Sequence, residues 1–316
     1  MTRYLAGRLA ETLLVLLAMS AVVYLLIGLM PGDPVDLMLG GDPTMKREDV
    51  ERLRALYGLD RPLWARYGAW AASALTGEFG YSRLFSKPVL EILWPRLGDT
   101  ALLMGASLLL STAIALPAGL WAARRPRSLV DYAVNLLCFA GISVPAFWLA
   151  LLLLMLFAVT LGWLPAGSVG EGAAEKLRHL VLPVTVLTLS QVGHHIRFVR
   201  AAAIEALRAD HIRTARAKGL SEAQVVWRHA LGHALPPVLT VLALSFGGLF
   251  SGALITETMF ARPGMGKTIY DAILGNDYNL ALVGLLLATA ATLAANLVAD
   301  VTHAALDPRV RIEGER

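Results

Sequence analysis

The chain has 316 residues, of which 56% are hydrophobic and only 16% are charged, and its mean hydropathy is +0.60. A soluble domain carries about 25% charged residues, so this composition excludes an ordinary soluble enzyme and predicts a protein of the lipid bilayer. The formal net charge of +4 is concentrated beside apolar runs, which favours anionic lipid or acidic protein partners over nucleic acid.

The apolar runs predict an all-α membrane protein with six transmembrane helices. A helix needs about 20 apolar residues to cross the hydrocarbon core. Runs of that length lie near 5–29, 99–122, 131–161, 179–199, 234–260 and 280–305. The first run is too long for a signal peptide, and "MPGDP" follows it in place of a small-residue cleavage site, so we expect it to remain as an anchor.

These spans divide the chain into segments. We expect an N-terminal transmembrane helix over 1–30 and an extracytoplasmic helical loop over 31–98. A transmembrane core follows over 99–305 and contains a cytoplasmic coupling loop at 200–233, and a short cytoplasmic tail covers 306–316.

The loop between the first two spans contains a second helical signal. Val50, Leu53 and Leu56 recur at helical spacing before Gly58, which predicts a small extracytoplasmic helical insertion. The aromatic residues that follow favour the membrane interface, with a docking surface as the alternative; they are Trp64, Tyr67, Trp70 and Trp94.

The distribution of Lys and Arg predicts the orientation. Fifteen of these residues flank the spans on the side of the two termini, and four lie in the two short loops of the opposite side. Short loops rich in Lys and Arg stay in the cytoplasm, so both termini are predicted to be cytoplasmic. The nine basic residues of the loop at 30–98 do not count, because that loop is long.

A proline and several ionisable residues interrupt three of the spans. Pro145 removes a backbone donor from the third run, which predicts one helix kinked there, with a re-entrant pair as the alternative. His194 and His195 point about 100° apart on a helix and cannot chelate one metal ion, so both are expected at the membrane interface. Glu257, near the end of the fifth span, is expected to face an outer vestibule or to make a structural hydrogen bond. The single cysteine, Cys138, is expected to serve packing.

The segment "RAAAIEALRADHIRTARAKGLSEAQVVWRHALGHALP" (200–236) is too polar to span a membrane, yet it keeps helical spacing. Gly219 predicts a left-handed helix end, and Ser221 with Gln224 predicts a capping box that begins a second helix. We call this predicted helix–glycine–helix segment the elbow. A partner protein that grips it would move both flanking spans, and the alternative is a helix pair lying on lipid headgroups.

The stretch "TMFARPGMGKTIY" (258–270) contains AxxxxGKT, one residue short of the phosphate-binding loop GxxxxGK[ST]. A phosphate-binding loop follows a strand in the nucleotide-containing compartment. Here Ala261 replaces the first glycine, the preceding segment is a predicted span, and the predicted side is extracytoplasmic. We therefore expect a turn made by Pro263, Gly264 and Gly266, followed by a short helix over the mouth of the path, and no nucleotide site.

The elbow sequence "LRADHIRTARAKGLSEAQVVWRHAL" resembles the cytoplasmic coupling loop of the permease subunits of bacterial ATP-binding-cassette importers, in the oligopeptide, dipeptide and nickel branch. "MPGDPVDLMLG", "YGLDRPLWARYGAW", "GEFGYS", "GISVPAFWLALLLLMLFAVTLGWLPA", "ETMFARPGMGKTIYDAI" and "NLVADVTHAALDPRVR" resemble other landmarks of the same subunit, so the resemblance covers nearly the whole chain.

The resemblance implies a type I importer permease of the bacterial cytoplasmic (inner) membrane that carries no catalytic residues and has no metal site and no cofactor of its own. The residues that match the signature of the coupling loop are implied to contact an ATPase; they are Asp210, Arg213, Thr214, Ala215, Arg216, Lys218 and Gly219. Glu257, Pro263, Gly264 and Gly266 are implied at the outer gate of the translocation path, where Arg262 and Lys267 would contact headgroups or a docked binding protein.

The implied partners are a homologous second permease, two ATP-binding subunits that hold ATP and Mg²⁺, an extracytoplasmic substrate-binding protein and membrane lipid, with no nucleic acid. Short peptides are the expected substrate, and nickel, a metal chelate or glutathione are alternatives within the branch. A secondary transporter driven by an ion gradient is the rival from another class; it predicts inverted repeats and paired midplane charges, and neither is evident in the sequence.

Overall fold

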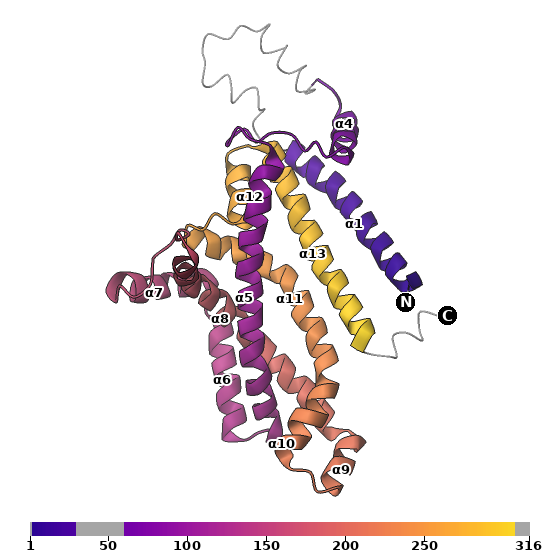
Figure 1. Cartoon of the computed structure of the whole chain (residues 1–316), viewed down its shortest axis with the longest axis vertical. Coiled ribbons are helices and arrows are strands. Elements are labelled where there is room, and N and C mark those ends of the chain that lie inside the picture. The colour runs from indigo at the N-terminus through magenta and orange to yellow at the C-terminus, as the bar shows by residue number, and fades with distance from the viewer. Residues whose placement is uncertain (1, 30–59, 307–316) are drawn as a thin grey trace. The chain divides into compact units, whose positions relative to one another are not determined.

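The computed structural model describes residues 2–29 and 60–306. Within these ranges every regular element is helical, apart from an isolated bridge between Tyr81 and Pro88, so the predicted all-α class is confirmed. The α-helices are labelled in Figure 1. They are α1 (Thr2–Gly28), α4 (Leu63–Leu75), α5 (Val89–Arg124), α6 (Leu129–Ser143), α7 (Ala146–Leu153), α8 (Ala173–Arg208), α9 (Asp210–Ala217), α10 (Glu222–Gln224), α11 (Leu231–Met259), α12 (Met265–Leu274) and α13 (Tyr278–Leu306). Two π-helical stretches, η1 (Leu154–Thr160) and η2 (Val225–Ala230), continue α7 and lead into α11.

The number of helices that qualify as spans by length and composition is smaller than the six predicted. Among the described residues, four helices are long and apolar enough to cross a membrane, namely Ala6–Gly28, Val89–Arg124, Glu222–Gly247 and Tyr278–Val298, and α6 with α7 brings the number to five if they form one broken span. The predicted span 179–199 lies in α8, which is long enough but is less apolar because Gln191, His194 and His195 interrupt it. A count of six transmembrane helices is therefore not confirmed.

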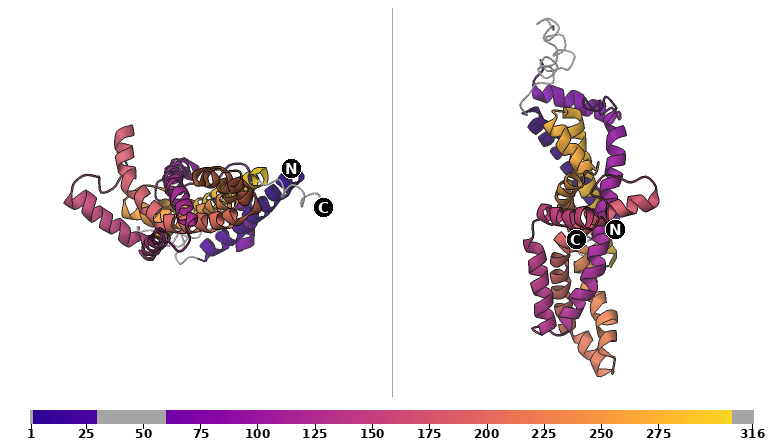
Figure 2. Two further views of the ribbon diagram at one scale, coloured as in Figure 1. Left: turned by 90° about the horizontal axis from the view of Figure 1, so that it is seen from below. Right: turned by 90° about the vertical axis from the view of Figure 1, so that its left-hand side faces the viewer.

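The third predicted span is broken rather than kinked. α6 ends at Ser143, α7 begins at Ala146, and the two helices meet at 93°, a bend visible in Figure 1 and from two further directions in Figure 2. Pro145 has φ −61° and ψ 136°, and Val144 before it is also extended. Proline disfavours the helical conformation of the residue before it, so the chain leaves the helix one residue ahead of Pro145.

The described residues form two compact units. The first contains residues up to Leu9, Gly98–Lys267 and the residues from Thr292 onwards. Its largest core joins buried side chains of α5, α6, α8, η2 and α11, among them Leu120, Cys138 and Val199. Cys138 is buried there, as the expected packing role requires.

Two glycines let helices of the first unit approach closely. A Cβ on Gly119 of α5 would lie 2.7 Å from Val199 of α8, and one on Gly193 of α8 would lie 2.8 Å from the carbonyl oxygen of Cys138 of α6. Small residues at crossings are typical of helix packing in membranes, where dispersion contacts carry much of the association.

The second unit takes in the described part of 10–97 and residues 268–291. Tyr24 of α1 packs against Tyr67 and Trp70 of α4, with ring centroids 5.5 and 5.8 Å away, and the Tyr67 hydroxyl hydrogen-bonds with Ser20 at 2.8 Å. Two of the four loop aromatics therefore pack internally, whereas Trp64 and Trp94 are exposed. The helical signal at Val50–Gly58 lies outside the described residues.

Candidate functional site

The elbow has the predicted helix–glycine–helix form. α8 ends at Arg208, Ala209 is extended with ψ 152°, and α9 follows. Gly219 has φ +77°, the left-handed conformation that glycine adopts without steric cost, and its amide donates to the Arg216 carbonyl at 2.9 Å. The predicted turn at Gly219 is confirmed, and the break at Ala209 is an addition that the helical spacing did not reveal.

The second helix of the elbow begins at the predicted capping box. The Ser221 hydroxyl accepts from the Gln224 amide at 3.4 Å, and the Gln224 side chain accepts from the Ser221 amide at 3.0 Å. This reciprocal pair satisfies backbone donors that the first turn of a helix leaves open. The helix then continues through η2 and α11 without a break at Gly232.

The elbow has a small core of its own. Ile212 and Ala215 of α9 are buried against Val225, Ala230 and Ala234 of the following helix. Figure 1 shows α9 and α10 at one end of the helices α6, α8 and α11 of this unit. α8 leads into this packed pair and α11 leaves it, so the chain joins the pair directly to both helices.

The residues implied to contact an ATPase divide into a surface set and a structural set. Asp210, Arg213, Thr214 and Lys218 are exposed, whereas Ala215 is buried in the elbow core. The exposed residues therefore form the outer face of α9.

An ion pair closes the elbow across the glycine turn. Arg216 Nε donates to Glu222 Oε1 at 2.8 Å, and Arg216 Nη2 donates to Oε2 at 3.3 Å. About half of each side chain is exposed, so this two-point contact orders the turn more than it adds stability.

A group of histidines on the elbow was not singled out from the sequence. The ring of His211 on α9 lies 4.0 Å from that of His233 on α11, centroid to centroid, and its Nε2 is buried without a hydrogen-bond partner in the described chain. Burial lowers the pKa of His211 below 6.5, the neighbouring His233 and His229 rings lower it further, and Asp210 opposes them. The i, i+4 spacing of His229 and His233 was the only sequence signal.

A second ion pair ties α6 to α8 near the elbow. Asp131 accepts from Arg200 with both carboxylate oxygens, at 2.5 and 2.6 Å, and also from the Arg127 amide at 2.8 Å and the Asn135 side chain at 2.9 Å. Asp131 also lies in the first turn of α6, whose N-cap is Ser128. One buried carboxylate thus binds both the turn that precedes α6 and the Arg200 side chain of α8.

His195 connects three helices, contrary to the interface position predicted for it. It is buried, its Nδ1 lies 2.7 Å from the Ser111 hydroxyl of α5, and its Nε2 lies 3.1 Å from the Ser245 hydroxyl of α11. Ser245 donates its only proton to the Val241 carbonyl at 2.8 Å, so His195 Nε2 must carry the proton and Nδ1 must accept. His194, its neighbour, is exposed.

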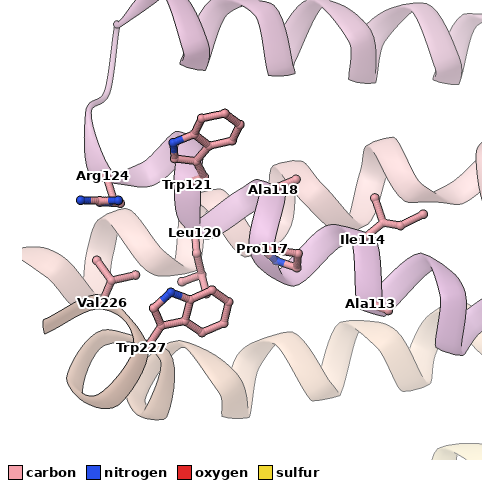
Figure 3. Close-up of a pocket in the computed structure, with 9 residues that line it drawn as sticks. All are labelled: Ala113, Ile114, Pro117, Ala118, Leu120, Trp121, Arg124, Val226 and Trp227. Carbon is pink, nitrogen blue, oxygen red and sulfur yellow. The ribbon is translucent and has the colours of Figure 1, made fainter. Parts of the chain in front are cut away.

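An apolar groove runs along the C-terminal end of α5 beside η2. It has a volume of about 560 Å³, and Figure 3 shows its lining residues, Ala113, Ile114, Pro117, Ala118, Leu120, Trp121, Arg124, Val226 and Trp227. The two indoles are more than half exposed. Because η2 is part of the elbow, the groove lies where α5 and the elbow meet.

At the opposite end of α11, the turn that precedes α12 is held by Glu257. This carboxylate is 1% exposed and accepts from the Thr100 hydroxyl at 2.5 Å and from the Lys267 amide at 2.9 Å. Four residues were implied at an outer gate. The Glu257 side chain projects from α11 to the turn, Gly264 and Gly266 pack against that side chain, and Pro263 precedes Gly264 in the turn. A helix precedes the turn where a phosphate-binding loop has a strand.

Arg262 is buried, although contact with headgroups or with a docked binding protein was predicted for it. It is 3% exposed, its amide donates to the Glu257 carbonyl at 2.8 Å, and its Nη1 has no hydrogen-bond partner among the described residues. Asp99 and Glu257 are the carboxylates that act on it electrostatically. Lys267, by contrast, is partly exposed.

Comparison with known proteins gives concordant matches. Residues 115–312 match the family described as the binding-protein-dependent transport system inner membrane component, and residues 1–102 match the N-terminal family of the same systems. The chain is 37% identical to a putative peptide permease protein of Brucella suis, over 99% of this chain and 100% of that one. It is 34% identical to the oligopeptide transport system permease protein AppB of Bacillus subtilis, over 98% and 99% of the two chains.

Two further comparisons extend this picture. The di/tripeptide transport system permease protein DppB of Pseudomonas aeruginosa is 37% identical, over 98% of this chain and 99% of that one. An inward-facing structure of the MetNI methionine ABC transporter superposes with a TM-score of 0.56 at 19% identity, over 70% of this chain and 99% of that one, and supports the fold. The chain therefore belongs to the binding-protein-dependent transport system inner membrane component family, the membrane permeases of ABC importers.

Proposed function

We propose that this chain is one permease subunit of an ATP-driven importer of short peptides in the bacterial inner membrane. The relatives that match over their whole length are named as permeases of peptide, oligopeptide or di/tripeptide systems, and this supports the substrate class. In this proposal the chain contributes half of the translocation path and no catalytic residue of its own.

The elbow is the observation that carries the coupling role. It is a short, internally packed helix pair, continuous with α11 and separated from α8 by one extended residue. Asp210, Arg213, Thr214 and Lys218 present charged and polar groups on the outer face of α9, and the Arg216–Glu222 pair sets its shape. A rigid helix seated in the groove of an ATPase passes the movement of that ATPase to both flanking helices.

The proposed assembly contains a homologous second permease, two cytoplasmic ATP-binding subunits that bind ATP and Mg²⁺, and an extracytoplasmic substrate-binding protein. This chain needs no cofactor of its own, and both of its termini lie in the cytoplasm. The α11–α12 turn then lies at the outer end of the path, where Glu257, Pro263, Gly264 and Gly266 form part of the outer gate.

Reconstitution of the complete transporter in vesicles tests the proposal. We expect uptake of labelled di- and tripeptides that requires ATP, the ATPase subunits and the loaded binding protein. Nickel and glutathione in the same assay identify the alternative substrates. Uptake by this chain alone, driven by an ion gradient, would overturn the importer assignment.

A variant of the elbow tests the coupling role. Gly219→Pro forces φ to about −65°, which is incompatible with the observed +77°, so the turn cannot form. We expect the variant to insert in the membrane but to lose uptake and binding of the ATPase subunits. Gly232→Ala is the matched control, because a Cβ there meets open space within a continuous helix. Normal uptake by Gly219→Pro would contradict the coupling role.

A further inference from the structure

The turn that resembles a phosphate-binding loop does hold an acidic group, and that group is the side chain of Glu257 of the chain itself. The N-terminus of α12 presents its first amides to the Glu257 carboxylate, with Lys267 N donating at 2.9 Å and the Gly266 amide adding a further hydrogen bond. Open amides and the helix dipole make a helix N-terminus suited to negative charge. Glu257, on the preceding helix α11, occupies the place that a phosphate would take.

The glycines of the sequence GMG make room for this carboxylate. A Cβ on Gly264 would lie 2.0 Å from the Glu257 carboxylate, and one on Gly266 would lie 2.9 Å from the Leu254 Cα. Neither glycine has a positive φ, so both are required by space and not by backbone conformation. The glycine pattern that imitates a phosphate-binding loop is thus explained by close packing around the side chain of Glu257.

Thr100 on α5 completes the arrangement. Its hydroxyl donates to Glu257 Oε1 at 2.5 Å and accepts from the Met265 amide at 2.8 Å. Thr100 and Met265 are fully buried, so water cannot replace either bond. One hydroxyl and one carboxylate therefore connect α5, α11 and the start of α12. We call Thr100, Glu257 and the amides of residues 265–267 the latch.

We propose that the latch makes the glycine-rich turn a rigid extension of α5 and α11, with Glu257 and Thr100 as positioning residues of the outer gate. Pro263, Gly264 and Gly266 alone would indicate a flexible hinge. With the latch closed, the turn moves with the two helices when the path opens and does not bend on its own. The gating role rests on the proposed importer function, whereas the rigidity of the turn does not.

Two independent substitutions break the latch without altering Glu257. Thr100→Val keeps the shape of the side chain but removes the hydroxyl, and Gly264→Ala places a methyl group where the carboxylate lies. Thr100→Ser keeps the hydroxyl and is expected to restore function. The controls are Thr112→Val on the same helix, whose hydroxyl bonds only to the Leu108 carbonyl, and Gly105→Ala, where a Cβ meets open space.

Three measurements on the complete transporter distinguish positioning from simple stability: the amount of assembled complex, the ATP hydrolysed per peptide imported, and hydrogen exchange of the amides at 265–267. We expect the Thr100→Val and Gly264→Ala transporters to assemble. Their amides at 265–267 should exchange about tenfold faster, and their ATP consumption per peptide should rise about tenfold. Each change corresponds to the loss of one buried hydrogen bond to the Glu257 carboxylate. Thr100→Ser and both controls should stay within about twofold of the unmodified protein.

Exchange in the unmodified protein provides a result that does not depend on the variants. We expect the amides at 265–267 to be as protected as those of neighbouring α11, both with and without ATP. Rapid exchange of these amides in either condition would overturn the latch. Latch variants with the same ATP consumption per peptide as the unmodified protein would also overturn it. Absence of peptide uptake by the unmodified transporter, with the amides still protected, would overturn the proposed function and leave the rigid turn in place.

Discussion

Asp131 and Arg200 form a two-point ion pair between α6 and α8, and Arg200 lies two turns before the end of α8, at the start of the elbow segment. The Asp131 side chain is 4% exposed and that of Arg200 is 24% exposed, so solvent screens the pair only weakly. Asp131 also accepts from the Arg127 amide just before α6, so the pair ties the start of α6 to the part of α8 that leads into α9.

A double-mutant cycle measures this pair. Asp131→Asn and Arg200→Gln should each destabilise the folded protein, and the interaction energy should be about 2 kcal/mol because both hydrogen bonds are charged and partly buried. Denaturant titration of the purified protein in lipid nanodiscs gives the free energies of unfolding. The same cycle on the exposed Asp210–Arg213 pair should give less than about 0.5 kcal/mol. An equal value for both pairs would show that Asp131 does not hold α8.

His195 should matter to stability, and its neighbour should not. His195→Leu leaves the Ser111 hydroxyl without its acceptor between packed helices, so we expect a loss of about 1–3 kcal/mol in the free energy of unfolding. His194→Leu changes an exposed side chain and should stay within about 0.5 kcal/mol. Nitrogen NMR of labelled protein should find His195 neutral and protonated on Nε2. A proton on Nδ1 would refute the hydrogen-bond chain through Ser245.

The elbow should lose stability as the pH falls below 6.5. The pKa of His211 is lowered in the folded protein, mainly by burial and then by His233 and His229, so the unfolded state binds protons first. Stability is fully present above about pH 6.5 and declines as the pH falls from there through the lower folded-state pKa. Proteolysis at the elbow should be faster at pH 5.5 than at pH 7.5. His211→Gln should reduce this difference, whereas His194→Gln should leave it unchanged.

Asp277 should anchor the segment that precedes α5. Its carboxylate accepts from the Ser82 hydroxyl at 2.5 Å and the Leu84 amide at 3.0 Å, and it caps α13 through the Leu280 amide at 3.2 Å. Asp277→Ala removes a helix cap and a buried tertiary contact together, and should cost about 2 kcal/mol of unfolding free energy.

Ser82→Ala tests the tertiary part of that contact. It removes one of the donors and should cost about 1 kcal/mol. Thr76→Ala, at an exposed hydroxyl bonded only to the nearby Ser73 carbonyl, should change thermal stability little. Equal effects of the serine and threonine substitutions would argue against the anchor.

The features that the sequence predicted correctly depend on contacts only a few residues apart. Gly219 is left-handed and Ser221 pairs with Gln224, because both signals act within one helical turn. The all-α membrane class follows from composition in the same direct way. Membership of the permease family was expected from the elbow and six further motifs, and the whole-length matches confirm it.

The contacts that the sequence did not predict join distant residues. Asp131 and Arg200 are 69 residues apart, Ser111 and His195 are 84 apart, and Thr100 and Glu257 are 157 apart. Pro145 indicated an interruption but not a bend of 93°, and the hydropathy of α8 did not settle the number of spans.

Arg262 and His195 were expected at surfaces and are buried. Helical periodicity tells which face of a helix is apolar, but a buried polar side chain finds its partner only when two helices cross at a particular height and rotation. That crossing is decided by the packing of whole helices, through small residues such as Gly119 and Gly193. This is why only the tertiary structure showed the Asp131–Arg200 pair, the hydrogen bonds of His195 and the position of the Glu257 side chain at the α11–α12 turn.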